Sequence, residues 1–555
     1  MKKTILTIIF AFILINVKAQ APNWAWAKGA GGTSPDFCYS TATDVNGNVY
    51  ITGKFSSPTI TFGAFTLTNN GGGWSDIFIV KYDPNGNVLW AKSEGDSYGE
   101  KANSITTDTV GNVIITGEFD SNSITFGSTT LFNNGSRNIF IAKYNTLGGF
   151  MWAKSSSVNS SSLPEDPKVA TDASGNIYIT GYCFSSLSFG TINLPNALYT
   201  AMMFLAKYDA FGNLIWAKKE SSTKHTQSYA ICTDALGHIY VTGRYFSPNI
   251  TFGTTILTNS DTTGNSPDMF LVKYNSSGNV IWAKGAGNIG YDIGMAVATD
   301  KLKNVVVSGE FSSPITFGST TLNNVDFRDL FIVKYDDSGN PIWAKGAGGL
   351  GYDQGNSLNI DNLNNIYLSG IYTSNSITFG ATTLYNSGNY YNVFIAQYND
   401  FGSPIWAKSA GSAGIDFGQS AIDQLGNVYL GGTYKYASTI NFDTTTLVNE
   451  DSLGNYEAVF IAKLGNFANG ITQINNPNEL SVYPNPNDGK FIVQHSSILL
   501  KSYVIYNTVG VNVLSHKSNL TNQFNIDLST QPKGIYFIEI TDINNNYLNK
   551  KIIIE

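Results

Sequence analysis

Acidic residues recur at one position of this sequence where they could together hold a cation or a basic ligand. An Asp recurs in short turns along the chain. In four places an acidic residue precedes this Asp by eight positions, and in a fifth place by seven positions. These acids are Asp36, Glu100, Asp292, Asp353 and Asp416, while Pro164 and Thr226 take the position elsewhere. Like charges around one opening cost energy unless a cation compensates them. The alternative is that each carboxylate accepts hydrogen bonds from amides of its own loop.

The turns that carry the recurring Asp follow the pattern Asp-x-x-Gly-Asn. Calcium needs six to eight converging oxygens, whereas each turn offers one Asp and one Asn, so we assign these residues to turn geometry. The histidines are scattered and no pair has metal-ligand spacing: His225, His238, His495 and His516. We therefore expect no catalytic residue, no metal site and no cofactor, and we do not expect an enzyme. A hydrolase acting on polysaccharide stays open, because a fold can bring distant acids together.

Three markers with one period show that these positions belong to a repeat. The tripeptide Trp-Ala-Lys occurs seven times at intervals of 61 to 66 residues, beginning at Trp26, Trp90, Trp152, Trp216, Trp282, Trp343 and Trp406. A glycine recurs in step at Gly53, Gly117, Gly181, Gly243, Gly309, Gly370 and Gly432. A phenylalanine recurs at Phe78, Phe140, Phe204, Phe270, Phe331, Phe394 and Phe460. No single ligand explains seven copies, so these residues are expected to build the scaffold.

Each repeat predicts four short strands, named a, b, c and d in chain order. Residues 41–44 and 49–53 are β-rich runs around a Gly turn, and residues 77–82 and 88–91 flank a second turn that contains Pro84. Four antiparallel strands repeated seven times with short connections fit the blades of a propeller better than a solenoid or a sandwich. The acidic position then falls on the d-to-a connection, beside a central channel.

The ends of the array predict a closed ring. The last repeat lacks a Trp-Ala-Lys strand after residue 463, while the first Trp-Ala-Lys, at Trp26, precedes any a strand. We expect residues 24–28 to supply strand d of the last repeat and so leave no open end. The Trp side chains should pack between neighbouring blades. A second recurring phenylalanine should form the core of a small hairpin between strands b and c of each repeat. It occurs at Phe62, Phe126, Phe189, Phe252, Phe317, Phe379 and Phe442.

The motifs Thr-Asp-x-x-Gly-Asn-x-Tyr-x-Thr-Gly and Lys-Tyr-Asp-x-x-Gly-Asn-x-x-Trp resemble the bacterial seven-bladed propeller repeats (SBBP type), over about residues 24–464. This resemblance implies a seven-bladed β-propeller. It implies little about function, since propellers host many activities.

Composition and the N-terminus indicate an exported protein. Lys2 and Lys3 precede an apolar stretch over residues 5–15, which predicts a signal peptide over residues 1–19. No other run is long enough for a membrane helix. A net charge of −7 without a basic stripe argues against nucleic acid. The chain has three cysteines, too few for a disulfide framework, and we expect buried thiols.

The predicted propeller spans residues 20–470 and is followed by a linker over residues 471–479. Residues 480–555 then predict a separate small β-sandwich. The sandwich closely resembles the type A C-terminal sorting domain of the type IX secretion system. The matching residues are Tyr483, Pro484, Asn485, Pro486, Gly489, Gly510, Gly534 and Tyr536. The resemblance implies recognition of this domain by the secretion machinery and residence outside the cell or on its surface.

The whole chain is thus predicted to be all-β, with a seven-bladed propeller closed by an N-terminal strand and followed by the sandwich. We expect a monomeric, secreted or cell-surface binding module for a glycan or a protein. Its specificity should lie in insertions that differ between repeats, such as residues 65–74 and 259–267. A structural or adhesive surface protein is a third possibility.

Overall fold

The computed structural model describes residues 21–465 and 480–555, apart from 134, 159–163, 197–199, 387–389, 413, 438, 452–453, 496–498, 508–510 and 544–546. The predicted signal peptide, the predicted linker and Gly510 lie outside the described residues. All the elements of the described part are β-strands, and most pair as small antiparallel sheets. No helix in that part is long and apolar enough to cross a membrane. The chain divides into two compact units, Met1–Asn466 and Phe467–Glu555.

Within the first unit, the described strands form seven four-stranded antiparallel sets. The first three sets are β2(Asp36–Thr43), β3(Val49–Phe55), β6(Asp76–Tyr82), β7(Val88–Glu94); β8(Glu100–Thr107), β9(Val113–Phe119), β12(Asn138–Tyr144), β13(Phe150–Val158); and β14(Pro164–Thr171), β15(Ile177–Cys183), β18(Met202–Tyr208), β19(Leu214–Lys219). Set 4 is β21(Thr226–Thr233), β22(Ile239–Tyr245), β25(Asp268–Tyr274), β26(Val280–Ala286). Each set corresponds to strands a to d of one repeat.

The last set takes its fourth strand from the beginning of the chain. Sets 5 to 7 are β27(Asp292–Thr299), β28(Val305–Phe311), β31(Asp329–Tyr335), β32(Pro341–Ala347); β33(Asp353–Ile360), β34(Ile366–Tyr372), β37(Asn392–Tyr398), β38(Pro404–Ser412); and β39(Ile415–Ile422), β40(Val428–Lys435), β43(Ala458–Leu464), β1(Trp24–Ala30). Strand β1 pairs antiparallel with β43, Trp24 lying opposite Leu464 and Ala30 opposite Val459. Residues at the two ends of the repeat array therefore share one sheet.

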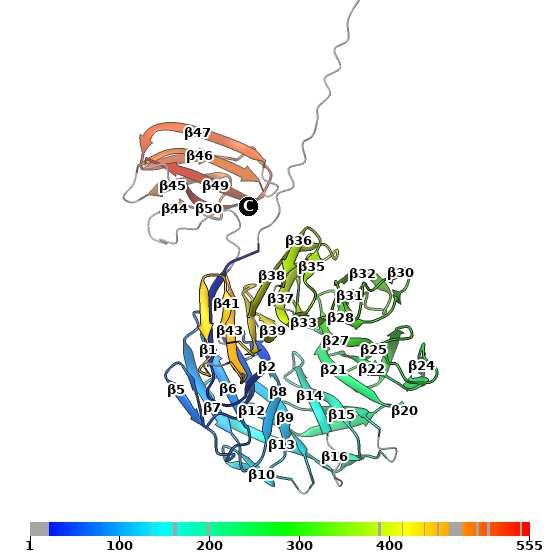
Figure 1. The fold of residues 1–555 in the computed structure, drawn as a ribbon. Helices are drawn as coiled ribbons and strands as arrows, with labels where there is room; N and C mark the ends of the chain where they lie inside the picture. Colours follow the sequence, from blue (N-terminus) through cyan, green and yellow to red (C-terminus); the bar gives the residue numbers. More distant parts are fainter. Residues whose placement is uncertain are drawn as a thin grey trace, which may run out of the picture. The chain divides into compact units, whose positions relative to one another are not determined.

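The first strand of every set lies toward the middle of the array (Figure 1). We call β2, β8, β14, β21, β27, β33 and β39 the inner strands. Each contacts the inner strand of the next set, and β39 contacts β2, so these contacts run round without a break. A belt of hydroxyl bonds follows the same path, because each Thr at the end of an inner strand donates to the carbonyl at the equivalent position of the preceding set. The donors are Thr43, Thr107, Thr171, Thr233 and Thr299.

The recurring Trp and Lys side chains fasten each set to its neighbour. Trp90 Nε1 and Lys81 Nζ both donate to the carbonyl oxygen of Thr146 in the next set, at 3.3 and 3.0 Å. At the junction of the chain ends, Trp26 Nε1 and Lys463 Nζ donate to the carbonyl oxygen of Pro84 in the same way. The expectation that these Trp residues pack between neighbouring repeats is confirmed at these contacts.

Small hairpins project between strands b and c and cover the sets. They are β4(Thr59–Phe62) with β5(Phe65–Thr68), β10(Ser123–Phe126) with β11(Thr129–Phe132), β16(Leu187–Phe189) with β17(Ile192–Leu194), β23(Asn249–Phe252) with β24(Thr255–Thr258), β29(Ile315–Phe317) with β30(Thr320–Leu322), β35(Ser376–Phe379) with β36(Thr382–Tyr385), and β41(Thr439–Phe442) with β42(Thr445–Val448). The short strand β20(Ser221–Ser222) pairs with β23. The recurring Phe of each hairpin is buried, as expected; Phe62, for example, packs on Phe78 with ring centroids 5.2 Å apart.

The second unit contains two sheets. One has the strand order β44(Leu480–Tyr483), β45(Lys490–His495), β48(Gln523–Asp527), and the other the order β47(Asn512–Thr521), β46(Leu500–Asn507), β49(Gly534–Asp542), β50(Tyr547–Ile554). Side chains of both sheets share one apolar core that includes Phe491, Ile505, Phe524 and Ile538.

Candidate functional site

The five predicted acids do not meet one another in the structure. Asp36, Glu100, Asp292 and Asp353 are the first residues of inner strands, and Asp416 is the second residue of β39, so the position belongs to the strand instead of the connection before it. All five side chains are fully buried. They are therefore not exposed at a channel mouth.

Each of these acids accepts hydrogen bonds from residues close to its own strand, and the partner of Asp416 is the last residue of β38 in the preceding set. Asp36 accepts from the Ser57 hydroxyl at 2.7 Å and from the Ser56 amide at 3.0 Å. The other four acids also accept hydrogen bonds from nearby backbone amides, and three of them accept one from a serine hydroxyl as well. The donors are Ser121 for Glu100, Asn288 for Asp292, Ser374 and Gly349 for Asp353, and Ser412 for Asp416. For Asp36, Glu100 and Asp353 the geometry supports the alternative in which the carboxylate holds its own loops together, whereas Asp416 ties its strand to the end of the preceding set.

Burial makes these carboxyl groups hard to ionise. Desolvation raises the pKa of Asp36, Glu100 and Asp416 to about 7 and that of Asp292 to about 8, although their hydrogen bonds oppose the shift. Desolvation also raises the pKa of Asp353. In the part of the chain that the structure describes, no group of three or more His, Cys, Asp or Glu side chains could hold a metal ion.

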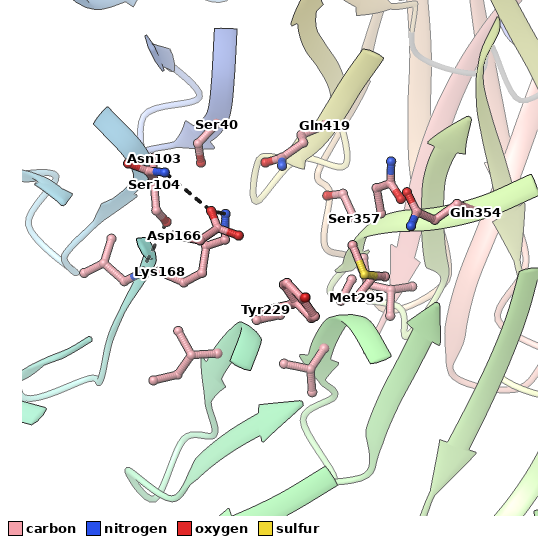
Figure 2. Close-up of a pocket in the computed structure, with 17 residues that line it drawn as sticks. Ser40, Asn103, Ser104, Asp166, Lys168, Tyr229, Met295, Gln354, Ser357 and Gln419 are labelled. Carbon is pink, nitrogen blue, oxygen red and sulfur yellow. Dashed lines mark hydrogen bonds and ion pairs between the residues drawn. The ribbon is translucent and has the colours of Figure 1, made fainter. Parts of the chain in front are cut away.

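The space that these acids were expected to line is formed by other side chains. A cavity of about 260 Å³ lies among the inner strands, and every inner strand contributes to it (Figure 2). Its polar lining includes Ser40, Asn103, Asp166, Lys168, Tyr229, Gln354, Asn356, Ser357 and Gln419. Amide and hydroxyl groups dominate this surface, and each amide side chain can both donate and accept hydrogen bonds.

A β-bulge turns side chains of the inner strands toward this cavity. Opposite each recurring glycine of sets 1, 2, 4, 5 and 6, the inner strand carries one extra residue: Tyr39, Asn103, Tyr229, Met295 and Asn356. The glycine is required there, because a Cβ at Gly309 would lie 1.8 Å from the carbonyl oxygen of Ile293. The sequence motifs did not single out these residues, although a glycine recurring inside a strand is itself a signal of a bulge.

In set 3 the bulge brings a charged pair into the cavity. Asp166 has a φ of 55°, a conformation that costs free energy in a residue with a side chain. Lys168 Nζ lies 2.8 Å from its carboxylate and Asn103 donates to it at 3.4 Å (Figure 2). Burial opposes ionisation of Asp166, but Lys168, Lys101 and Asn103 outweigh it and lower its pKa.

The residue after each recurring glycine differs from set to set and carries charge in four of them: Lys54, Glu118, Arg244 and Glu310. Glu118 forms an ion pair with Arg137 at 2.9 Å and with Lys101 at 3.3 Å. Glu310 pairs with Arg328 and accepts a 2.8 Å hydrogen bond from Gln354 of the cavity. Both glutamates are buried, so their arginine partners compensate charges that would otherwise be costly.

Aromatic side chains of sets 5 to 7 form a continuous series beside the cavity. We define the aromatic arc as Phe327, Tyr352, Tyr391 and Phe417, whose successive ring centroids lie 6.3, 5.7 and 5.7 Å apart. Phe327 is 61% exposed and Phe417 43% exposed. In strand β39, Phe417 and the cavity residue Gln419 are two residues apart and so point to the same side of the strand. Phe417 of the arc therefore lies on the same side of β39 as a residue that lines the cavity.

The two insertions singled out from sequence are built differently. Residues 65–68 form β5, and beyond them Trp74 is 58% exposed with its ring 6.2 Å from that of Tyr98. In residues 259–267, the buried Asn259 amide donates to the carbonyl oxygens of Tyr245 and Ser266, which fixes the loop. All three cysteines are free; Cys38 and Cys183 are buried as expected, while Cys232 is partly exposed.

The motif residues of the second unit position its turns. Asn485 Nδ2 donates to the Lys551 carbonyl at 2.7 Å, and its Oδ1 accepts from the Ile553 amide at 2.8 Å, which ties the Tyr-Pro-Asn-Pro segment to β50. Gly489 has a φ of 99°, and a Cβ there would lie 2.6 Å from the Cα of Ser529. Tyr536 is buried and donates to the Pro532 carbonyl at 2.6 Å, while Gly534 begins β49. Tyr483 stays 67% exposed.

Comparison with known proteins supports the repeat and identifies the second unit. A WD repeat-containing protein of Acanthamoeba polyphaga mimivirus is 27% identical over 457 residues, covering 68% of this chain and 33% of that protein. The chain thus spans about a third of the length of this curated relative. Together with the many small antiparallel sheets, this similarity indicates a propeller-like repeat protein.

Two solved structures show weak likeness. Sqt1 from Chaetomium thermophilum has a TM-score of 0.34 at 9% identity, covering 80% of this chain and 99% of that one. Xylan beta-1,4-xylosidase from Bacillus halodurans has a TM-score of 0.26 at 9% identity, covering 70% and 90%. We infer no activity from either.

Residues 481–555 match the family described as "Secretion system C-terminal sorting domain". The resemblance of the C-terminal motifs to this domain is thereby confirmed. The chain carries a sorting domain of the type IX secretion system, which indicates export to the cell surface or the extracellular space.

Proposed function

We propose that this chain is an exported, monomeric, non-enzymatic binding protein whose first unit is a seven-bladed β-propeller of the bacterial repeat type. In this proposal each four-stranded set is one blade, β1 closes the ring, the second unit is a β-sandwich, and the N-terminal residues are a cleaved signal peptide. The unbroken contacts among the inner strands and the pairing of β1 with β43 support the closed ring.

The ligand that fits the cavity and the aromatic arc best is a glycan. Sugar hydroxyls both donate and accept hydrogen bonds, as do the amides of Asn103, Gln354, Asn356 and Gln419 that line the cavity. The exposed faces of the aromatic arc can pack against the apolar faces of pyranose rings. The observation that carries the proposal is that this surface differs from blade to blade, whereas the rest of each blade repeats.

The proposed site can be tested by removing one exposed ring. Phe417→Ala in the full chain should weaken binding of glycans identified on an array by about tenfold, which is roughly 1.4 kcal/mol. Phe401, which is 81% exposed in a c-to-d turn, provides the matched control, and Phe401→Ala should leave affinity unchanged. Equal affinity of both variants, or an array without any bound glycan, would contradict the proposal.

A polysaccharide hydrolase and an adhesive protein without a small ligand remain the two competing functions. The acids first considered for hydrolysis are buried and accept hydrogen bonds from residues close to their own strands, so the geometry does not favour that function. Product release from the same glycans by the purified chain would nevertheless establish it, and attachment assays would reveal adhesion.

A further inference from the structure

Arg244 contacts Tyr229, which lines the cavity, and has no anionic partner among the described residues. Arg244 follows the recurring Gly243 in β22, at the repeat position where Glu118 stands in β9 and Glu310 in β28. The charge at this position is therefore reversed in set 4, as it also is in set 1, where Lys54 follows Gly53. Whereas both glutamates pair with an arginine, Arg244 forms no ion pair with any described residue.

The guanidinium group of Arg244 is nevertheless held in place. Its Nε donates to Gln227 Oε1 at 2.8 Å, and the Tyr229 hydroxyl donates to the same oxygen at 3.2 Å. The guanidinium carbon lies 5.5 Å from the ring centroid of Tyr229 and 5.4 Å from that of Phe246. Two aromatic faces and one hydrogen bond thus fix the plane of the group. Its terminal nitrogens have no hydrogen-bond acceptor within the part of the chain that the structure describes.

The nearest carboxylates are engaged elsewhere. Glu165, Asp166 and Glu310 all act on the phenol of Tyr229 through their charge. However, Glu165 accepts from the Tyr182 hydroxyl at 3.0 Å, Asp166 binds Lys168, and Glu310 binds Arg328. No ion pair joins any of the three to Arg244.

A partly buried cation without a counter-charge is costly, and a fixed planar guanidinium is suited to a two-point hydrogen bond with a carboxylate. Tyr229, which supports Arg244, also lines the cavity, so a group bound by Arg244 lies beside the amides of the proposed glycan site. We propose that Arg244 recognises the carboxylate of an acidic sugar, so that the ligand is a uronate-containing polysaccharide. This inference rests on the proposed glycan binding and adds the charge of the ligand.

The experiment compares two probes that differ at the carboxyl group, which is charged in oligogalacturonate and neutral in its fully methyl-esterified form. Calorimetric titration of the full chain should give tighter binding of the free acid. Arg244→Gln should weaken acid binding by about 10- to 100-fold and leave binding of the ester unchanged. Arg244→Lys should recover only part of the loss, because lysine keeps the charge but lacks the planar fork.

Lys154→Gln provides the matched control, since it removes the same charge from an exposed position of β13 and should leave both affinities unchanged. Thermal unfolding of Arg244→Gln should match that of the parent chain, which separates lost recognition from lost folding. Equal affinity of both probes, or acid binding that survives Arg244→Gln, would overturn the inference while leaving glycan binding intact.

If neither probe binds, both this inference and the proposed function fail for these sugars. A poly-glutamate peptide completes the set of probes. Binding of the peptide but not of oligogalacturonate, lost in Arg244→Gln, would overturn the sugar assignment and identify an acidic protein as the partner.

Discussion

In five of the seven sets, the two ends of the inner strand carry acidic residues that behave in opposite ways. At the turn end of β2, Asp44 accepts from the Asn48 side chain and the Tyr50 hydroxyl, both at 2.8 Å, and lies 3.2 Å from Lys81 Nζ. Burial opposes its ionisation, but these partners outweigh it and lower its pKa. At the other end, Asp36 has no cation beside it, and burial raises its pKa to about 7.

This contrast shows that the turn end is the uniform part of the molecule and the opposite end the variable one. The turn Asp, the Thr belt and the Trp–Lys contacts recur along the array, whereas the residue after the recurring glycine can be lysine, glutamate, arginine or tyrosine. A scaffold that is stabilised mainly by repeated contacts can tolerate variation at one end, and that end contains the cavity and the aromatic arc.

The largest effect should follow from removing the strand that completes the repeated scaffold. Deletion of residues 21–30 uncovers β43 and removes the buried Trp24 and Ala27, at a cost on the order of 5 kcal/mol. Calorimetry should show a lower unfolding temperature, and proteolysis should cut near β43. A chain ending at residue 479, which retains β1, should show neither change. An unaltered transition in the deletion variant would contradict closure by β1.

A smaller loss of folding stability should follow from placing a side chain at the glycine opposite the β-bulge. Gly309→Ala places a methyl group against the Ile293 carbonyl and should cost about 3 kcal/mol in denaturant unfolding. At Gly29 an added Cβ would lie 3.6 Å from its nearest neighbouring atom, so Gly29→Ala should cost less than about 1 kcal/mol. If the two variants were equally stable, the recurring glycine would not be needed for the bulge.

The third test compares the two classes of acid directly. The pKa of Asp292 is about 8 in the native state and about 3.9 in the unfolded state, so the native state binds more protons between these two pH values. The contribution of Asp292 to the free energy of unfolding therefore falls as pH rises from about 4 to 8. Asp292→Asn should therefore flatten the decline of unfolding free energy over this range. A pH profile identical to that of the parent chain would argue against a proton retained on Asp292.

Asp44→Asn should act in the opposite sense. Because the pKa of Asp44 is lowered in the native state, its carboxylate stabilises that state at any pH above the pKa of the unfolded chain. Removing the carboxylate also leaves Lys81 buried without its partner, so about 3 kcal/mol of unfolding free energy should be lost at pH 7. The loss should vanish as pH falls below the native pKa of Asp44. If Asp44→Asn and Asp292→Asn shifted stability in the same direction at pH 7, the two ends would not differ as described.

The sequence predicted the repeated features well and the site poorly. Trp26 and Phe62 recur with a fixed period and do the same job each time, so periodicity alone reveals their roles. Asp36 also recurs, but sequence carries no information on whether a carboxylate faces solvent or its own loop. Arg244 does not recur, and its significance depends on the absence of a counter-charge among the described residues, which only three-dimensional neighbours reveal.

The pairing of Trp24 with Leu464 also sets an order of events in time. A ribosome adding about 5 to 20 residues per second needs roughly 20 to 90 s to make the intervening chain. Throughout that interval β1 has been synthesised but its partner has not, so β1 has no strand to pair with. The first strand to be made can therefore pair only after the last strand of the repeat array has been made.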